Sequence, residues 1–200
     1  QIESPGQREL IGKFAPEVFN DLIIDISLFR PGPVKSDMIT PFLKARQGWS
    51  APRLIHPSLY EILAETEGVV VFHEQVIRII ATIAGISLAQ AESYRRILND
   101  PEQSVDFYPW FIARARERGY PIEVVEEVND VLRAFASFGF CKAHAAAFAL
   151  PTYQSAWLKT HYPAHFIAGL LTHDPGMYPK RLLLDEARQM GVTLLPLDIN

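Results

Sequence analysis

The sequence lacks the features that define several classes of protein. It has one cysteine, Cys141, and no apolar run of about 18 residues or more. A single cysteine excludes an internal disulfide and a zinc site built from several thiolates, so we expect a reducing, cytoplasmic setting. We expect neither a membrane span nor a secretory signal. Glycine-rich phosphate loops and the serine-hydrolase and HExxH motifs are also absent.

The composition is that of a globular domain. Hydrophobic residues make up 48% and charged residues 21% of the 200 positions, which excludes a disordered chain. The 15 prolines and 11 glycines would interrupt a coiled coil repeatedly. The net charge of -4 argues against nucleic-acid binding over the whole surface, but not against a local basic patch.

Apolar spacing, caps and breakers predict a compact, mostly α fold with minor short β segments. We expect a strand or a helix start at 69–72 and a strand at 192–195. The alanine-rich helix at 143–159 should be the most buried, with Trp157 in the core, and Pro151 should kink or split it. The expected helices span 5–15, 16–29, 37–47, 58–66, 74–84, 88–98, 102–118, 122–137, 143–159, 163–172 and 179–190.

Three pairs of side chains have a reactive or metal-binding interpretation. They are Cys141 with His144, His161 with His165, and Asp21 with Asp25. The first pair could be a nucleophile and its base, and the other two have spacings that suit metal ligands. For each pair the structural interpretation is favoured, because a lone cysteine usually packs as a small side chain and neither metal pair has an evident third ligand.

The basic residues are more informative. Five cations lie between positions 30 and 53 against one acid, Asp37; they are Arg30, Lys35, Lys44, Arg46 and Arg53. Arg95 and Arg96 end a predicted helix, where the helix dipole favours cations and could by itself explain the pair. Lys142 and His144 begin the alanine-rich helix, where free amide groups attract anions. Arg30, the arginine pair and residues 142–144 would form one anion-binding face if the fold brings them together.

Several motifs occur in a family-specific order along the chain. They are Arg-Pro-Gly-Pro within 28–38, Glu-Gln-Val within 72–79, the paired arginines within 91–96, the Lys-Ala-His stretch at 138–150, the Tyr-Gln-Ser-Ala-Trp stretch at 153–164, and 195–200. Together they resemble the C-family bacterial DNA polymerases, the alpha subunits of DNA polymerase III, over essentially the whole chain. The resemblance implies that residues 1–200 are the fingers region of a longer polymerase, a reading that the initial Gln1 also suggests.

The resemblance also implies a division of labour. The catalytic aspartates and two Mg²⁺ ions would lie in a palm upstream, so this fragment would bind no metal and be inactive alone. Template-primer DNA and a dNTP would be its partners, with the sliding clamp and other replisome subunits bound by regions outside it, and no membrane. The implied nucleotide-binding residues are Arg30, Arg95, Arg96, Lys142, His144 and Phe148, and the implied DNA-binding residues are Lys35, Lys44 and Arg46.

Departures from the family pattern leave two alternatives open. Phe148 stands where the family commonly has Tyr, Cys141 where it often has Asn, and His73 where it often has Gln. After the arginine pair, residues 98–100 lack the usual lysines, and 174–179 resembles the error-prone branch. The chain could therefore serve replication or error-prone translesion synthesis. The other alternative is a free-standing helical module that binds nucleic acid or protein.

Overall fold

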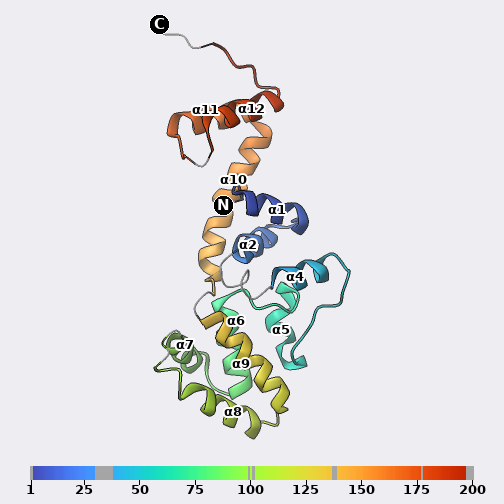
Figure 1. Cartoon of the computed structure of the whole chain (residues 1–200), viewed down its shortest axis with the longest axis vertical. Helices are drawn as coiled ribbons and strands as arrows, with labels where there is room; N and C mark the ends of the chain where they lie inside the picture. Colours follow the sequence, from blue (N-terminus) through green and yellow to red (C-terminus); the bar gives the residue numbers. More distant parts are fainter. Residues whose placement is uncertain are drawn as a thin grey trace.

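The structure is a computed structural model that describes residues 2–29, 38–98, 100, 102–136, 139–176 and 178–196. These residues are mostly helical, as predicted (Figure 1). The α-helices are α1 (Pro5–Phe14), α2 (Phe19–Leu28), α4 (Ile39–Arg46), α5 (Tyr60–Leu63), α6 (His73–Ala84), α7 (Leu88–Ile97), α8 (Phe107–Glu117), α9 (Ile122–Ala136), α10 (Lys142–His161), α11 (Pro163–His173) and α12 (Lys180–Gln189). Two 3₁₀ turns, η1 (Pro57–Leu59) and η2 (Ala64–Thr66), flank α5.

Local caps explain where several of these helices begin and end. The Ser4 hydroxyl accepts a hydrogen bond from the Gln7 amide at 3.4 Å at the start of α1. At the start of α7, the Ser87 hydroxyl accepts from the Gln90 amide at 3.3 Å while the Gln90 side chain accepts from the Ser87 amide at 3.1 Å. Gly85 ends α6 with φ 66°, which a glycine adopts without strain. The predictions at these positions are confirmed.

The predicted β segments are wrong in the part of the chain that the structure describes. Residues 69–72 lie in neither a strand nor a helix; their one sheet-like contact is an isolated parallel bridge between Phe72 and Phe140. Residues 192–196 have no regular structure. In both cases apolar residues suited a strand locally, but no strand among the described residues lies alongside to pair with them.

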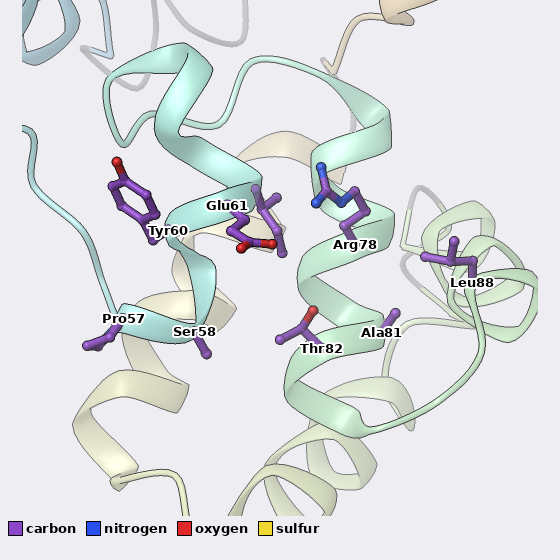
Figure 2. A pocket seen from close by; sticks show the side chains of 9 residues that line it. Pro57, Ser58, Tyr60, Glu61, Arg78, Ala81, Thr82 and Leu88 are labelled. Carbon is purple, nitrogen blue, oxygen red and sulfur yellow. The ribbon is translucent and has the colours of Figure 1, made fainter.

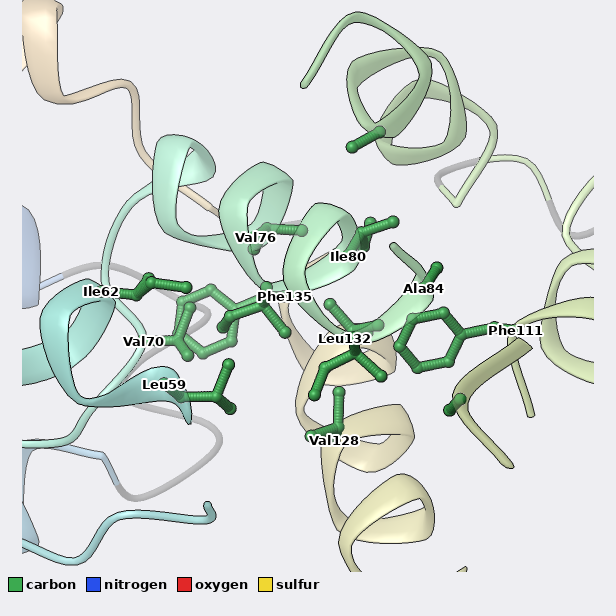
Figure 3. Close-up of a cluster of buried hydrophobic side chains, with 14 of the residues drawn as sticks. Leu59, Ile62, Val70, Val76, Ile80, Ala84, Phe111, Val128, Leu132 and Phe135 are labelled. Carbon is green, nitrogen blue, oxygen red and sulfur yellow. The ribbon is translucent and has the colours of Figure 1, made fainter. Parts of the chain in front are cut away.

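Two clusters of buried side chains meet at residues 69–72, where Val70 belongs to the larger cluster and Val69, Val71 and Phe72 to the smaller one. The larger cluster joins α5 to α9, with Ile80, Phe111 and Leu132 among its buried members (Figure 3). The smaller cluster joins α1, α2, α4, residues 69–72 and the first half of α10. Figure 1 shows α10 running from the N-terminal end of α6 past α1 and α2 to α11 and α12. The long helix therefore links the two clusters to the C-terminal helices.

The expectation that the alanine-rich helix is the most buried is wrong. Within α10 only Ala145, Ala149 and Thr152 are buried, whereas Trp157 is 44% exposed. Small side chains on one face let α2 approach closely, whereas the large side chains Phe148 and Tyr153 stay exposed. Nor does Pro151 split the helix, which runs unbroken from Lys142 to His161.

Among the described residues, no single helix is long and apolar enough to span a membrane. Helices α6 and α7 pass that test only as a pair, and they are bent by 114° relative to each other.

Candidate functional site

The N-terminal ends of α6 and α10 meet, although 69 positions separate their first residues in the sequence. The His73 amide donates to the Phe140 carbonyl at 2.9 Å, next to the Phe72–Phe140 bridge. The Glu74 carboxylate accepts the Lys142 amide, with both oxygens at 3.1 Å from the nitrogen. Glu74 therefore satisfies a free amide at the start of α10, the position where an anion is favoured.

Gln75 fixes the start of α6. Its side chain is buried, and its Oε1 accepts from the amides of Val71 at 2.8 Å and Phe72 at 3.0 Å. Its Nε2 donates to the Ile62 carbonyl at 3.1 Å and to the Thr66 hydroxyl at 2.8 Å. All four bonds lie in the interior, where an unpaired polar group would cost about 1–3 kcal/mol. The Glu-Gln pair therefore has two separate structural tasks: Glu74 caps α10 and Gln75 anchors the segment before α6.

The C-terminal end of α7 adds two arginines beside this junction. The Arg95 Nη1 lies 3.3 Å from the His73 Nδ1, and its Nε and Nη2 donate to the two oxygens of Glu92 at 2.7 and 2.9 Å. The Arg96 Nε donates to Glu92 at 2.9 Å. The Arg95 side chain is 18% exposed and that of Arg96 is 73% exposed. Arg95 is therefore part of the junction, while Arg96 extends into solvent.

His73 is held neutral at this junction. Burial, followed by the nearby Arg95 guanidinium, lowers its pKa below the ordinary value. A neutral ring leaves Nδ1 free to accept from Arg95. Gly139 approaches closely, since a Cβ there would lie 2.7 Å from the His73 Nδ1. A side chain at position 139 would therefore push the ring away from Arg95.

Lys142 completes the group that we call the basic cluster: Arg95, Arg96 and Lys142. The Lys142 Nζ forms an ion pair with Glu65 and lies 5.4 Å from the centre of the Phe72 ring. Arg95 reaches the start of α6 through its 3.3 Å contact with the His73 Nδ1, one residue before the Glu74 that accepts the Lys142 amide. The structure thus places the Arg95 guanidinium and the Lys142 amide at neighbouring residues of α6, His73 and Glu74, although the two are far apart in the sequence.

An aromatic row continues from this cluster along α10. The His144 ring meets Phe140 at a centroid distance of 5.3 Å and Phe148 at 4.6 Å, both edge to face. Phe148 is 38% exposed and His144 is also exposed. These rings present an apolar surface of the kind that packs against a sugar or a base.

The remaining predicted site residues have different positions. Arg30 and Lys35 lie outside the described residues. Lys44 is exposed on α4. Arg46 instead pairs with Asp21 at 2.6 Å and donates to the Phe14 carbonyl at 2.8 Å, so it ties α4 to the α1–α2 junction.

The three reactive or metal-binding pairs stay without support in the described residues. Those residues contain no group of three His, Cys, Asp or Glu side chains placed to hold a metal. His161 and His165 are exposed on different helices, α10 and α11. The Cys141 thiol lies 3.5 Å from the Glu74 carboxylate. Its hydrogen bond is therefore to Glu74, and this is not the arrangement of a nucleophile activated by His144 as a base.

Sequence reasoning missed the carboxylates that accompany the basic cluster. Glu92 lies three and four positions before the arginines, a spacing that does predict ion pairs on a helix. Glu65 is 77 positions from Lys142, and no local signal could have joined them. The arginine hydrogen bonds, that from Arg95 first, lower the pKa of Glu92 to about 2, so it is ionised at neutral pH.

A separate pocket of about 450 Å³ lies between α6 and the η1–α5 turn (Figure 2). Glu61 and Arg78 face it from opposite walls, with Thr82 and Leu88 nearby. None of its lining residues belongs to the basic cluster. It is therefore a different feature from the candidate site.

The comparisons with known proteins identify the family of the chain. Residues 1–119 match the family described as the bacterial DNA polymerase III alpha subunit finger domain. The whole chain is 41% identical to an error-prone DNA polymerase of Symbiobacterium thermophilum and covers 19% of that protein. It is 39% and 36% identical to the DNA polymerase III subunits alpha of Vibrio cholerae and Escherichia coli, and covers 18% of each. The chain belongs to the DNA polymerase III alpha subunit finger-domain family and spans about a fifth of the length of these relatives.

Proposed function

We propose that the chain is the fingers region of a DNA-directed DNA polymerase and that its basic cluster binds the triphosphate of the incoming deoxynucleotide. The observation that supports the proposal is the convergence of the C-terminal end of α7 and the N-terminal ends of α6 and α10 in a chain of this family. Guanidinium groups donate to phosphate oxygens in a planar fork, and helix N-termini attract anions. Both kinds of group are present at one place.

The chemistry would be in-line phosphoryl transfer from the nucleotide to the primer 3′ end. Two Mg²⁺ ions, held by palm carboxylates outside residues 1–200, would activate the attacking oxygen and stabilise the leaving pyrophosphate. Arg96 and Lys142 position the triphosphate and neutralise its charge, and Arg95 supports them from the junction. His144 and Phe148 pack against the sugar or base.

A second basic region, around α4 and the residues before it, makes the contacts with template-primer DNA. Lys44 is exposed on α4, and Arg30 and Lys35 precede that helix in the sequence. Arg46 is committed to Asp21, so we assign the DNA contact to Lys44 and Lys35. The sliding clamp and replisome subunits bind other parts of the polymerase. Relatives of the replicative and the error-prone type resemble the chain to similar degrees, so the proposal covers both branches.

Removal of the Arg96 guanidinium tests the proposal. In the full-length polymerase, Arg96→Ala should reduce the single-turnover rate of incorporation about a hundred- to a thousandfold, the usual cost of losing one preorganised contact to developing charge. The melting temperature should change little, because the side chain is 73% exposed. Arg95 can take over part of the role, so the double variant Arg95→Ala/Arg96→Ala should be slower still.

Arg114→Ala is the matched control. Arg114 lies on α8 and forms an ion pair with Glu117 three positions away at 2.9 Å, outside the candidate site. It should incorporate nucleotides at the wild-type rate. A folded double variant of Arg95 and Arg96 with wild-type activity would contradict the proposal and leave the pair as charges that complement a helix end.

A further inference from the structure

Each cation of the basic cluster is already paired with a carboxylate of this chain. Glu92 accepts from both arginines, and Glu65 pairs with the Lys142 ammonium. Glu74 accepts the Lys142 amide. Three glutamates thus accompany the three cations of the basic cluster, and these six side-chain charges sum to zero. An anion that approaches the arginine pair therefore competes with Glu92 for the Nε and Nη2 donors of Arg95 and for the Nε donor of Arg96.

Glu92 is the carboxylate that an incoming phosphate would meet. It bonds Arg95 through both oxygens and Arg96 through one, so it is the shared acceptor of the arginine pair. Its side chain is 29% exposed, so solvent and ligands reach it. Glu74 is different, because it accepts a backbone amide and the thiol of the α10 cap and so has a structural task.

We propose that Glu92 is a built-in competitor of the triphosphate: it occupies the Nε and Nη2 groups of Arg95 and the Nε group of Arg96 until the nucleotide displaces it, and so lowers the affinity for the nucleotide. The inference rests on the proposed function of the basic cluster. An intramolecular carboxylate is present at high effective concentration, so every ligand loses the free energy of the Glu92 contacts when it binds. Once the carboxylate has left, the free energy lost with the Glu92 contacts is the same in the bound ground state and in the transition state. It therefore weakens nucleotide binding without slowing the chemical step.

Glu92→Gln in the full-length polymerase tests the inference. Glutamine keeps the shape and one acceptor oxygen, so it can still orient the guanidinium groups, but it removes the competing charge. We expect the dNTP concentration that gives half the maximal single-turnover rate to fall about two- to fivefold, the range for a partly exposed ion pair. The maximal rate should remain within a factor of two of the wild type.

Glu117→Gln is the matched control, because it removes the same charge from an arginine three positions away on α8. It should leave both quantities unchanged. The melting temperatures of both variants establish that the chains are folded.

The outcomes separate this inference from the proposed function. If Glu92→Gln leaves the half-saturating concentration unchanged or raises it while Arg96→Ala still slows incorporation, Glu92 orients the arginines and the competitor role is wrong. If neither variant affects nucleotide use in a folded enzyme, the basic cluster does not bind the triphosphate, and both proposals fail. A fall with Glu92→Gln at an unchanged maximal rate supports the inference.

Discussion

Asp25, on α2, is a fully buried carboxyl whose two oxygens have no hydrogen-bond partner among the described residues. Burial raises its pKa to about 7. One turn earlier on the helix, Asp21 behaves in the opposite way. Burial would raise the pKa of Asp21, but the amides of Glu17 and Val18 and the Arg46 guanidinium hold it below its ordinary value. Two aspartates on one helix therefore give opposite pH responses.

Asp25 should make folding stability fall as the pH rises. Below about pH 4 its carboxyl is protonated in both the folded and the unfolded chain, so its ionisation does not lower the free energy of unfolding. Between about pH 4 and pH 7 the unfolded chain releases the proton while the folded chain keeps it, so the free energy of unfolding decreases, by about 2–4 kcal/mol in total. Asp25→Asn should remove this decrease, giving a variant more stable than the wild type at pH 8 but not at pH 4. Urea unfolding at a series of pH values measures it.

Asp21→Asn is the control for that measurement, because the sign reverses. The lowered pKa of Asp21 contributes stability above its unfolded value of about 4, and that contribution is lost as the pH falls. The variant should therefore be less stable than the wild type at pH 7, with a smaller difference in acid. A wild-type chain whose stability does not depend on Asp25 between pH 4 and pH 8 would contradict the assignment of the raised pKa.

At the scale of the elements, sequence reasoning succeeded where the signal was local. The caps at Ser4 and Ser87 and the stop at Gly85 depend on neighbours within four positions, and the structure confirms them. The burial of α10 failed because it depends on which helices pack against it. An alanine-rich sequence allows close packing but does not require it, and here it is used mainly by α2 along one face of the helix.

The exposure of α10 changes the expected consequence of truncating Trp157. The ring is 44% exposed and contacts His161 and Tyr162 at the end of the helix, so Trp157→Ala should cost about 1 kcal/mol or less. Phe107→Ala should cost about 3–5 kcal/mol, because Phe107 is fully buried and packs against Phe111 at a centroid distance of 5.4 Å. Chemical denaturation of both variants compares them directly. Equal losses would show that Trp157 is covered in solution.

At the scale of the whole molecule, the candidate site could be predicted only in part. The family resemblance picked out Arg95, Arg96 and Lys142, and the structure places Arg95 beside His73 at the start of α6. The partners of these cations were not predicted. Glu65 and Glu74 reach Lys142 across long stretches of chain, and such contacts follow from how α6 and α10 meet, not from any periodicity.

A second charged group joins the C-terminal helices to the rest of the molecule. The Lys159 ammonium, on α10, is 18% exposed and lies 2.9 Å from Glu186 on α12 and 3.3 Å from Glu3 before α1. Arg8 pairs with Glu3 as well. Figure 1 shows α11 and α12 at the end of α10, far from α5 to α9. Lys159 therefore lies where α12 meets α10 and the N-terminal segment.

Removal of this ammonium should loosen α12 without unfolding the rest. Lys159→Met keeps the apolar stem but leaves Glu186 with only the longer 3.9 Å ion pair to Arg8 in place of its 2.9 Å partner, and this weaker pairing of a partly buried carboxylate destabilises the docked helix by about 1–2 kcal/mol. Amide hydrogen exchange should accelerate roughly five- to thirtyfold in α12 and stay unchanged in α6, whose inner face lies in the larger buried cluster. Lys180→Met is the control, since Lys180 is 60% exposed and pairs with Asp174 at 3.3 Å near the surface. If both variants leave exchange in α12 unchanged, the burial of Leu183 and Ala187 holds the helix in place and the ion pairs do not contribute to its stability.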